Sequence, residues 1–144
     1  MLRRTFLTLA ASTLVLVACS DAPTGPDPRA VGVYALLSIN GQPLPMRLGV
    51  AGPSATDLVG GMMTINADAT YSLRLDVQTT VYQTTQPGHV STAPLWRFGS
   101  YTRRGSTYRF LDTQGDLVAT GTVSGTEVVF IFSDGRTTYR FARG

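Results

Sequence analysis

The stretch Thr70-Tyr-Ser-Leu-Arg-Leu-Asp-Val77 decides the fold class, because its side chains alternate between apolar and polar. The apolar residues occupy the odd-numbered positions from Tyr71 to Val77, and the polar residues occupy the even-numbered positions between them. Successive side chains of a β-strand point to opposite faces of its sheet. The stretch is therefore typical of a strand that buries one face in a core and exposes the other to water.

The same alternation recurs later in the chain. Trp96 and Phe98 flank Arg97, and aromatic residues likewise flank Arg140, so these aromatic side chains are expected to point inward. Short runs rich in Val, Ile, Thr, Tyr and Phe are separated by Gly, Asn, Asp and Ser at a spacing of about 8 to 12 residues. These runs predict strands at residues 31–39, 61–65, 70–80, 95–103, 107–112, 117–123, 126–132 and 137–142.

The turns between the predicted strands are short. Ser124-Gly125 and Asp134-Gly135 contain residue types that adopt the positive φ angles of tight hairpins. Short links join antiparallel neighbours. We therefore predict an all-β protein whose fold is an antiparallel up-and-down β-barrel of about eight strands. A barrel of this size holds either its own side chains or one small ligand.

The amino terminus has the organisation of an export signal. Arg3 and Arg4 form a basic head, and the uncharged run over residues 6–18 ends in a small residue before Cys19. The run is shorter than the roughly 20 apolar residues that a membrane-spanning helix needs. The sequence Leu16-Val-Ala-Cys19 resembles the lipobox of bacterial lipoproteins. That resemblance implies cleavage before Cys19 and attachment of lipid to the thiol of this residue, the only cysteine.

These observations divide the chain into three parts. Residues 1–18 are predicted to be a lipoprotein signal peptide, residues 19–30 the lipidated cysteine with a Pro-rich flexible linker, and residues 31–144 the barrel domain. We expect the lipid at Cys19 to anchor the protein to a membrane of the cell envelope. Ser20 follows the cysteine where an inner-membrane retention signal has aspartate, so the resemblance implies the outer membrane if the cell has two membranes.

Charge and residue types exclude several functions. The chain has 12 basic residues, all arginine, and losing Arg3 and Arg4 leaves a net charge of +1 against nine acidic residues. The arginines form no basic run, so no nucleic-acid partner is expected. The single histidine, His89, lies in a polar stretch that predicts an exposed loop, and Glu127 is the only glutamate. We therefore expect no enzyme activity, no metal and no cofactor.

The opening of the barrel domain resembles a known family. The segment Gly32-Val-Tyr-Ala-Leu-Leu-Ser-Ile-Asn-Gly-Gln-Pro-Leu-Pro45 is similar to the first strand and turn of lipocalin-like bacterial lipoproteins, and META-type domains share such an opening. Tyr34 stands where the lipocalin pattern has tryptophan. The resemblance implies that Arg140 packs over the ring of this first-strand aromatic residue. It also implies a barrel that binds a small apolar ligand.

Two functions stay open on the sequence. In the first, a hollow barrel binds a small apolar ligand, lined by Tyr71, Leu73, Leu75, Trp96, Phe98, Phe130 and Phe141. In the second, those residues fill a solid core, and a monomeric domain acts as a structural or protein-interaction module of the envelope. The contact surface would then be the two least regular segments, residues 44–60 and 79–94. The Thr/Gln-rich run at residues 79–86 has an alternative interpretation as the extension of a hairpin.

Overall fold

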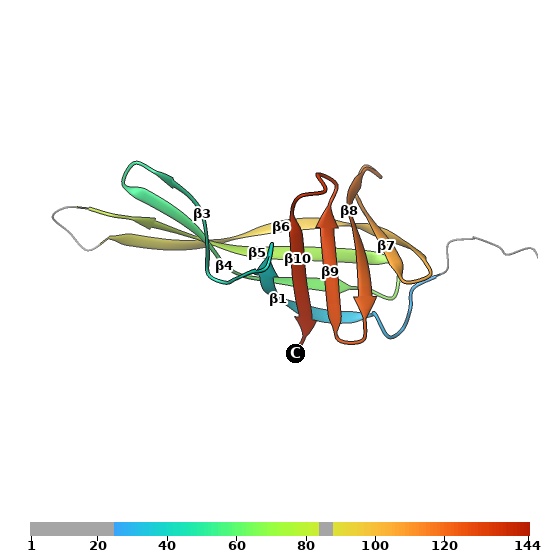
Figure 1. The fold of residues 1–144 in the computed structure, drawn as a ribbon. Helices are drawn as coiled ribbons and strands as arrows, with labels where there is room; N and C mark the ends of the chain where they lie inside the picture. Colours follow the sequence, from blue (N-terminus) through green and yellow to red (C-terminus); the bar gives the residue numbers. More distant parts are fainter. Residues whose placement is uncertain (1–24, 84–87) are drawn as a thin grey trace, which may run out of the picture.

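The computed structural model describes residues 25–83 and 88–144, and every regular element in these ranges is a β-strand. The predicted all-β class is confirmed. Figure 1 shows the strands wrapped into a barrel, with a sheet that extends to one side. The strands are β1 (Gly32–Ile39), β2 (Gln42–Pro43), β3 (Met46–Ala51), β4 (Ser54–Ile65), β5 (Thr70–Val81), β6 (His89–Arg104), β7 (Thr107–Asp112), β8 (Leu117–Ser124), β9 (Glu127–Phe132) and β10 (Thr138–Arg143).

Antiparallel pairing closes the barrel. From β4 to β10 each strand pairs with the next one along the chain, and β10 pairs with β1. The ring closes where β1 also pairs with β4, with Gly32 opposite Ile65 and Ala35 opposite Met62. Eight strands therefore form a closed up-and-down barrel, as the sequence predicted, and β2 and β3 are additional. Closure removes the open edges of a sheet over this part of the fold.

Three of the barrel strands continue past the barrel. Residues 54–59 of β4, 76–81 of β5 and 89–94 of β6, together with β3, form a four-stranded sheet that we call the arm. The arm is the projection on the left of Figure 1.

The prediction that residues 44–60 and 79–94 are the least regular segments of the domain is wrong for most of both. The extended hairpin is the correct interpretation for residues 79–81; residues 84–87 lie outside the described ranges.

Aromatic side chains fill the barrel. The ring centroid of Phe110 lies 5.1 Å from that of Tyr71 and 4.9 Å from that of Phe130. Phe110 and Phe130 are completely buried, and Tyr71 is 2% exposed. Leu73 and other aliphatic residues surround these rings. Contacts at this separation match the edge-to-face and tilted geometries that aromatic rings prefer, so the barrel has a packed aromatic centre.

The segment before β1 contacts the base of the barrel. The Tyr34 hydroxyl donates to the carbonyl of Ala30 at 2.8 Å, and Ala30 is only 2% exposed. Arg103 reaches back to the carboxylate of Asp27, with 3.1 Å between Nη1 and Oδ2. Residues 27–30, which were expected to belong to the flexible linker, therefore pack against the barrel. Cys19 and residues 1–18 lie outside the described part of the chain.

An arginine packs over Tyr34, but it is Arg143 and not the expected Arg140. The guanidinium carbon of Arg143 lies 5.0 Å from the centroid of the Tyr34 ring. Arg140 instead pairs with Glu127 on the neighbouring strand and stays exposed. The register explains the difference, because Arg143 is the residue of β10 directly opposite Tyr34, whereas Arg140 is opposite Ser38.

Candidate functional site

The seven predicted ligand-lining residues separate into two groups. Tyr71, Leu73, Phe130 and Phe141 are in the buried core, and Leu75 packs against it. Trp96 and Phe98 are 49% and 55% exposed and lie on the outer face of the sheet. The expectation that these two aromatic residues point inward is wrong.

The register of β5 and β6 gives the reason for this correction. Arg97 lies directly opposite Leu73 and Leu95 lies opposite Leu75, so the odd-numbered residues of β6 share the inner face. Alternation showed that Trp96 and Phe98 share a face but did not show which face it is. Arg97 occupies the inner face because that part of β6 is at the mouth of the barrel, where the side chain still reaches solvent.

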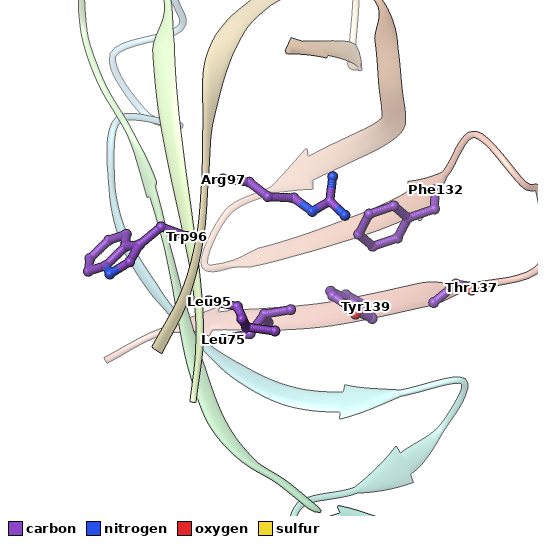
Figure 2. Close-up of a pocket in the computed structure, with 7 residues that line it drawn as sticks. All are labelled: Leu75, Leu95, Trp96, Arg97, Phe132, Thr137 and Tyr139. Carbon is purple, nitrogen blue, oxygen red and sulfur yellow. The ribbon is translucent and has the colours of Figure 1, made fainter. Parts of the chain in front are cut away.

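A hollow of about 400 Å³ lies at this mouth. In Figure 2, Arg97 extends toward Phe132 and Tyr139 on one side of β6, whereas Trp96 points to the opposite side. The guanidinium carbon of Arg97 is 6.0 Å from the centroid of the Phe132 ring. The wall consists of Leu75, Leu95, Trp96, Arg97, Phe132, Thr137 and Tyr139. The hollow thus combines apolar and aromatic side chains with polar groups, among them one guanidinium.

Burial and charge act in opposite directions on two tyrosines of this region. Burial raises the pKa of Tyr139 above its usual value, and the nearby Arg97 opposes that rise. The same two causes act on Tyr71, whose pKa is also raised. Both hydroxyls are therefore neutral at physiological pH, and Arg97 is the charged group at the mouth.

A second candidate site is the free edge of β6. The pairing of β6 with β7 begins only at Gly99, opposite Asp112, so residues 89–98 pair with β5 alone among the described residues. The backbone N–H of Tyr101 donates to the carbonyl of Ala69, on the β5 side. Backbone groups alternate in direction along a strand. The even-numbered residues therefore direct their C=O groups and, except at Pro94, their N–H groups away from β5. These residues are Val90, Thr92, Pro94, Trp96 and Phe98.

Pro94 is a residue type expected on an edge strand such as this part of β6. Proline has no N–H to donate and occurs in sheets mainly on edge strands. Its even-numbered position places the missing donor on the free side, so the ladder with β5 stays intact. The signal was present in the sequence, since a proline inside a run of strand-forming residues favours an edge strand. His89, expected in a loop, is instead the exposed first residue of β6.

The opposite edge of the arm is β3. This strand pairs with β4 through Met46 opposite Leu58 and Ala51 opposite Ser54, and a register shift falls between Arg47 and Gly49. Arg47 forms an ion pair with Asp57 across the two strands. A bulge and a charged pair are features that discourage pairing with another chain. The edge of β6 is therefore the more accessible of the two.

The described residues contain neither a metal-binding cluster nor a membrane-spanning helix. They contain no cluster of three or more His, Cys, Asp and Glu side chains that could hold a metal ion. No helix long and apolar enough to cross a membrane occurs in residues 25–83 and 88–144.

The geometry defines the class of the protein as an eight-stranded antiparallel barrel with a projecting four-stranded arm. Comparison of the chain with protein-family models, with curated proteins and with solved structures finds no match.

Proposed function

We propose that the protein is a lipid-anchored, exported protein of the cell envelope whose filled barrel holds the arm in position to bind another protein. The observation that carries this proposal is the free edge of β6 on a sheet that projects from the barrel. Anchoring rests on the lipobox-like sequence that ends at Cys19. The packed centre favours action through the surface over uptake of a ligand into the barrel.

The proposed mode of binding is the addition of an extended strand from the partner to β6. Outward-directed backbone groups supply hydrogen bonds, and side chains beside them supply apolar contact and specificity. Val90 and Leu95 are 53% and 57% exposed, and Trp96 adds a large aromatic surface next to the same edge. These side chains are larger and more apolar than those of an edge that is protected by charge.

A proline substitution on the free edge of β6 tests this mode of binding. A photo-reactive amino acid at Val90 is expected to form adducts with the partner in the exporting host. Thr92→Pro should abolish those adducts, because it removes an N–H on the free side and leaves the ladder with β5 intact. Thr92→Ala is the matched control and should preserve them.

A second position controls for contact with other surfaces. A photo-reactive residue at Thr122, which is exposed on β8, should give no adduct with the same partner. Equal adducts from Val90 and Thr122, or adducts from Val90 that survive Thr92→Pro in a folded protein, would contradict binding at the β6 edge.

The mouth of the barrel favours one other function, the binding of a small amphiphile with an anionic group. The observation in its favour is the guanidinium of Arg97, whose carbon lies 6.0 Å from the centroid of the Phe132 ring in a hollow that also has aliphatic walls. Native mass spectrometry of the protein from an exporting host, with dodecanoate as the added probe, tests it. A complex that Arg97→Gln weakens would support this function; a mass without ligand at saturating dodecanoate would reject it.

A further inference from the structure

We propose that a groove on the outer face, beside Phe98, binds a neutral saccharide. The groove has a volume of about 570 Å³, within the usual range for small-molecule sites. Within the groove, Phe98 and Ser100 lie on the opposite face of β6 from Arg97 and the mouth of the barrel. This inference does not rest on the proposed protein partner, although Trp96 and Phe98 also belong to the free edge of β6.

Five of the nine residues that line the groove have uncharged polar side chains, and these stand around an apolar surface. Four hydroxyl side chains, one amide and one carboxylate surround an aromatic ring. They belong to Thr70, Ser72, Ser100, Thr113, Asn66, Asp112 and Phe98, with Tyr71 and Gly99 beneath. Hydroxyl and amide groups both donate and accept hydrogen bonds, whereas a carboxylate only accepts. A ligand with many hydroxyl groups satisfies such a set, because each of its hydroxyls also donates and accepts.

Phe98 supplies the apolar component. Its side chain is 55% exposed, and its ring is parallel to that of Trp96 within 5°, with 5.6 Å between the centroids. The guanidinium carbon of Arg74 lies 5.9 Å from the centroid of the Trp96 ring. The same guanidinium forms an ion pair with Asp76, with 2.7 Å between Nε and Oδ1. Asp76, Arg74, Trp96 and Phe98 thus form a row of contacting side chains, which fixes the orientation of the phenyl ring. The ring is thus available as a rigid surface for contact.

The chemistry of pyranose rings matches this combination. A pyranose with equatorial substituents directs its C–H groups to its two faces and its hydroxyls to the rim. The slightly positive C–H groups are attracted to the negative face of an aromatic ring. A sugar that stacks on Phe98 therefore places its hydroxyls near Ser72 and Ser100, which line the same groove.

Several of the polar groups are held in place before any ligand arrives. Oδ1 of Asp112 accepts hydrogen bonds from the N–H groups of Gln114 at 2.8 Å and Asp116 at 2.9 Å. Nδ2 of Asn66 donates to the hydroxyl oxygen of Thr70 at 2.9 Å. Side chains fixed in this way lose little conformational entropy on binding. The second oxygen of Asp112 is left to accept from a ligand hydroxyl.

The charges of the residues that line the groove favour a neutral ligand. None of the described residues that line the groove carries a positive charge, and Asp112 carries a negative one. Asp112 would therefore repel an anionic ligand. A purely apolar ligand would leave the hydroxyl and amide groups without partners, which is costly. A neutral saccharide of one or two rings avoids both penalties.

The experiment uses two probes, N-acetylglucosamine and cellobiose, with sorbitol as the open-chain control. Backbone amide chemical shifts in NMR spectra report the site, and the fluorescence of Trp96, the single tryptophan, reports the stacked pair beside it. We expect at least one cyclic sugar to shift the amides of Ser72, Ser100 and Thr113, and sorbitol to leave them unchanged. The shifted set would exclude the mouth of the barrel.

Variants separate stacking from general surface effects. Phe98→Ala should raise the dissociation constant about tenfold, the effect of losing roughly 1.4 kcal/mol of binding, and Ser100→Ala should raise it severalfold. Leu37→Ala is the control, because Leu37 is 50% exposed on strand β1, which does not contribute to the groove. The amide spectrum of each variant also verifies that it is folded. The proposal is overturned if neither sugar shifts these amides, if sorbitol shifts them equally, or if Phe98→Ala binds as tightly as the unaltered protein.

Discussion

Arg143 and Tyr34 join the end of the last strand to the start of the first. The Nη2 atom of Arg143 donates to the Tyr34 hydroxyl at 2.9 Å and to the carbonyl of Val31 at 2.7 Å, while the guanidinium lies over the phenol ring. Gly32 makes room for it, since a Cβ there would be 2.7 Å from Nη2. The pair closes the base of the barrel where β1 and β10 meet.

Replacing Arg143 should destabilise the protein strongly. Arg143→Ala removes the cation–π contact and the charged hydrogen bonds, with an expected loss of about 2–4 kcal/mol in the free energy of unfolding. Arg140→Ala is the control, because it removes an exposed ion pair with Glu127 and should cost only about 0–1 kcal/mol. Urea unfolding measures both. Equal losses for the two variants would show that the contact with Tyr34 is not important for stability.

Phe130 and Ile131 are neighbours on β9 with opposite roles. Phe130→Ala should cost about 3–5 kcal/mol, because it opens a cavity beside Phe110 at the centre of the barrel. Ile131 is 38% exposed, so Ile131→Ala should cost much less. Thermal and urea unfolding distinguish these outcomes. A small loss for Phe130→Ala would indicate that the barrel interior is loosely packed rather than filled.

Gly99 should not tolerate a side chain. A Cβ at this position would be 1.8 Å from the carbonyl oxygen of Leu111 and 2.9 Å from the Tyr71 ring, so β6 and β7 would have to separate. We expect Gly99→Ala to lower the midpoint of urea unfolding substantially. Gly49→Ala is the matched substitution, because open space surrounds that position in β3. Its midpoint should remain close to that of the unaltered protein.

Acid should destabilise the turn between β9 and β10. The backbone N–H groups of Thr137 and Arg136 and the hydroxyl of Thr137 lower the pKa of Asp134 in the folded protein. The unfolded chain then binds the proton more tightly, so this stabilisation is present above about pH 4 and is lost as the pH falls through the folded pKa. Asp134→Asn should reduce the decline of the urea midpoint between about pH 5 and pH 2. An unchanged decline would assign it to other carboxylates, such as Asp68, whose pKa is also lowered.

Cys19 is expected to determine where the protein resides. Cys19→Ser should prevent lipid attachment and transfer the protein from the membrane fraction to the soluble fraction of the exporting host. Intact-mass measurement of the membrane form should show acyl chains on a chain that begins at residue 19. A Cys19→Ser protein that stays in the membrane fraction with an unchanged mass would contradict the lipobox interpretation.

The barrel could be predicted from the sequence, whereas the arm could not. Alternation in residues 70–77 identified a half-buried strand, and short Gly- and Asp-containing turns required antiparallel neighbours. The arm is nearly symmetric in polarity, because segments such as Thr79-Thr-Val81 carry polar residues on both faces. Without a continuous apolar face there is no period-2 hydrophobic signal, and such segments resemble loops.

The candidate sites were less accessible to sequence reasoning for a related reason. Periodicity placed Trp96 and Phe98 together but left the choice between the inner and outer face to the register with Leu73 and Leu75. A register is a long-range property, set by which hairpins pair and where the bulges fall. The groove beside Phe98 likewise gathers residues from three strands and two turns. No local pattern predicts that assembly.

Pro94 limits the self-association of this protein through the free edge of β6. An uninterrupted row of backbone donors along residues 89–98 would serve as a template on which copies could add one after another into a fibre. The proline leaves a gap in that row, with outward N–H groups at Val90 and Thr92 on one side and at Trp96 and Phe98 on the other. An incoming strand can therefore register with only a short stretch at a time, which is enough for a transient complex and too little to propagate.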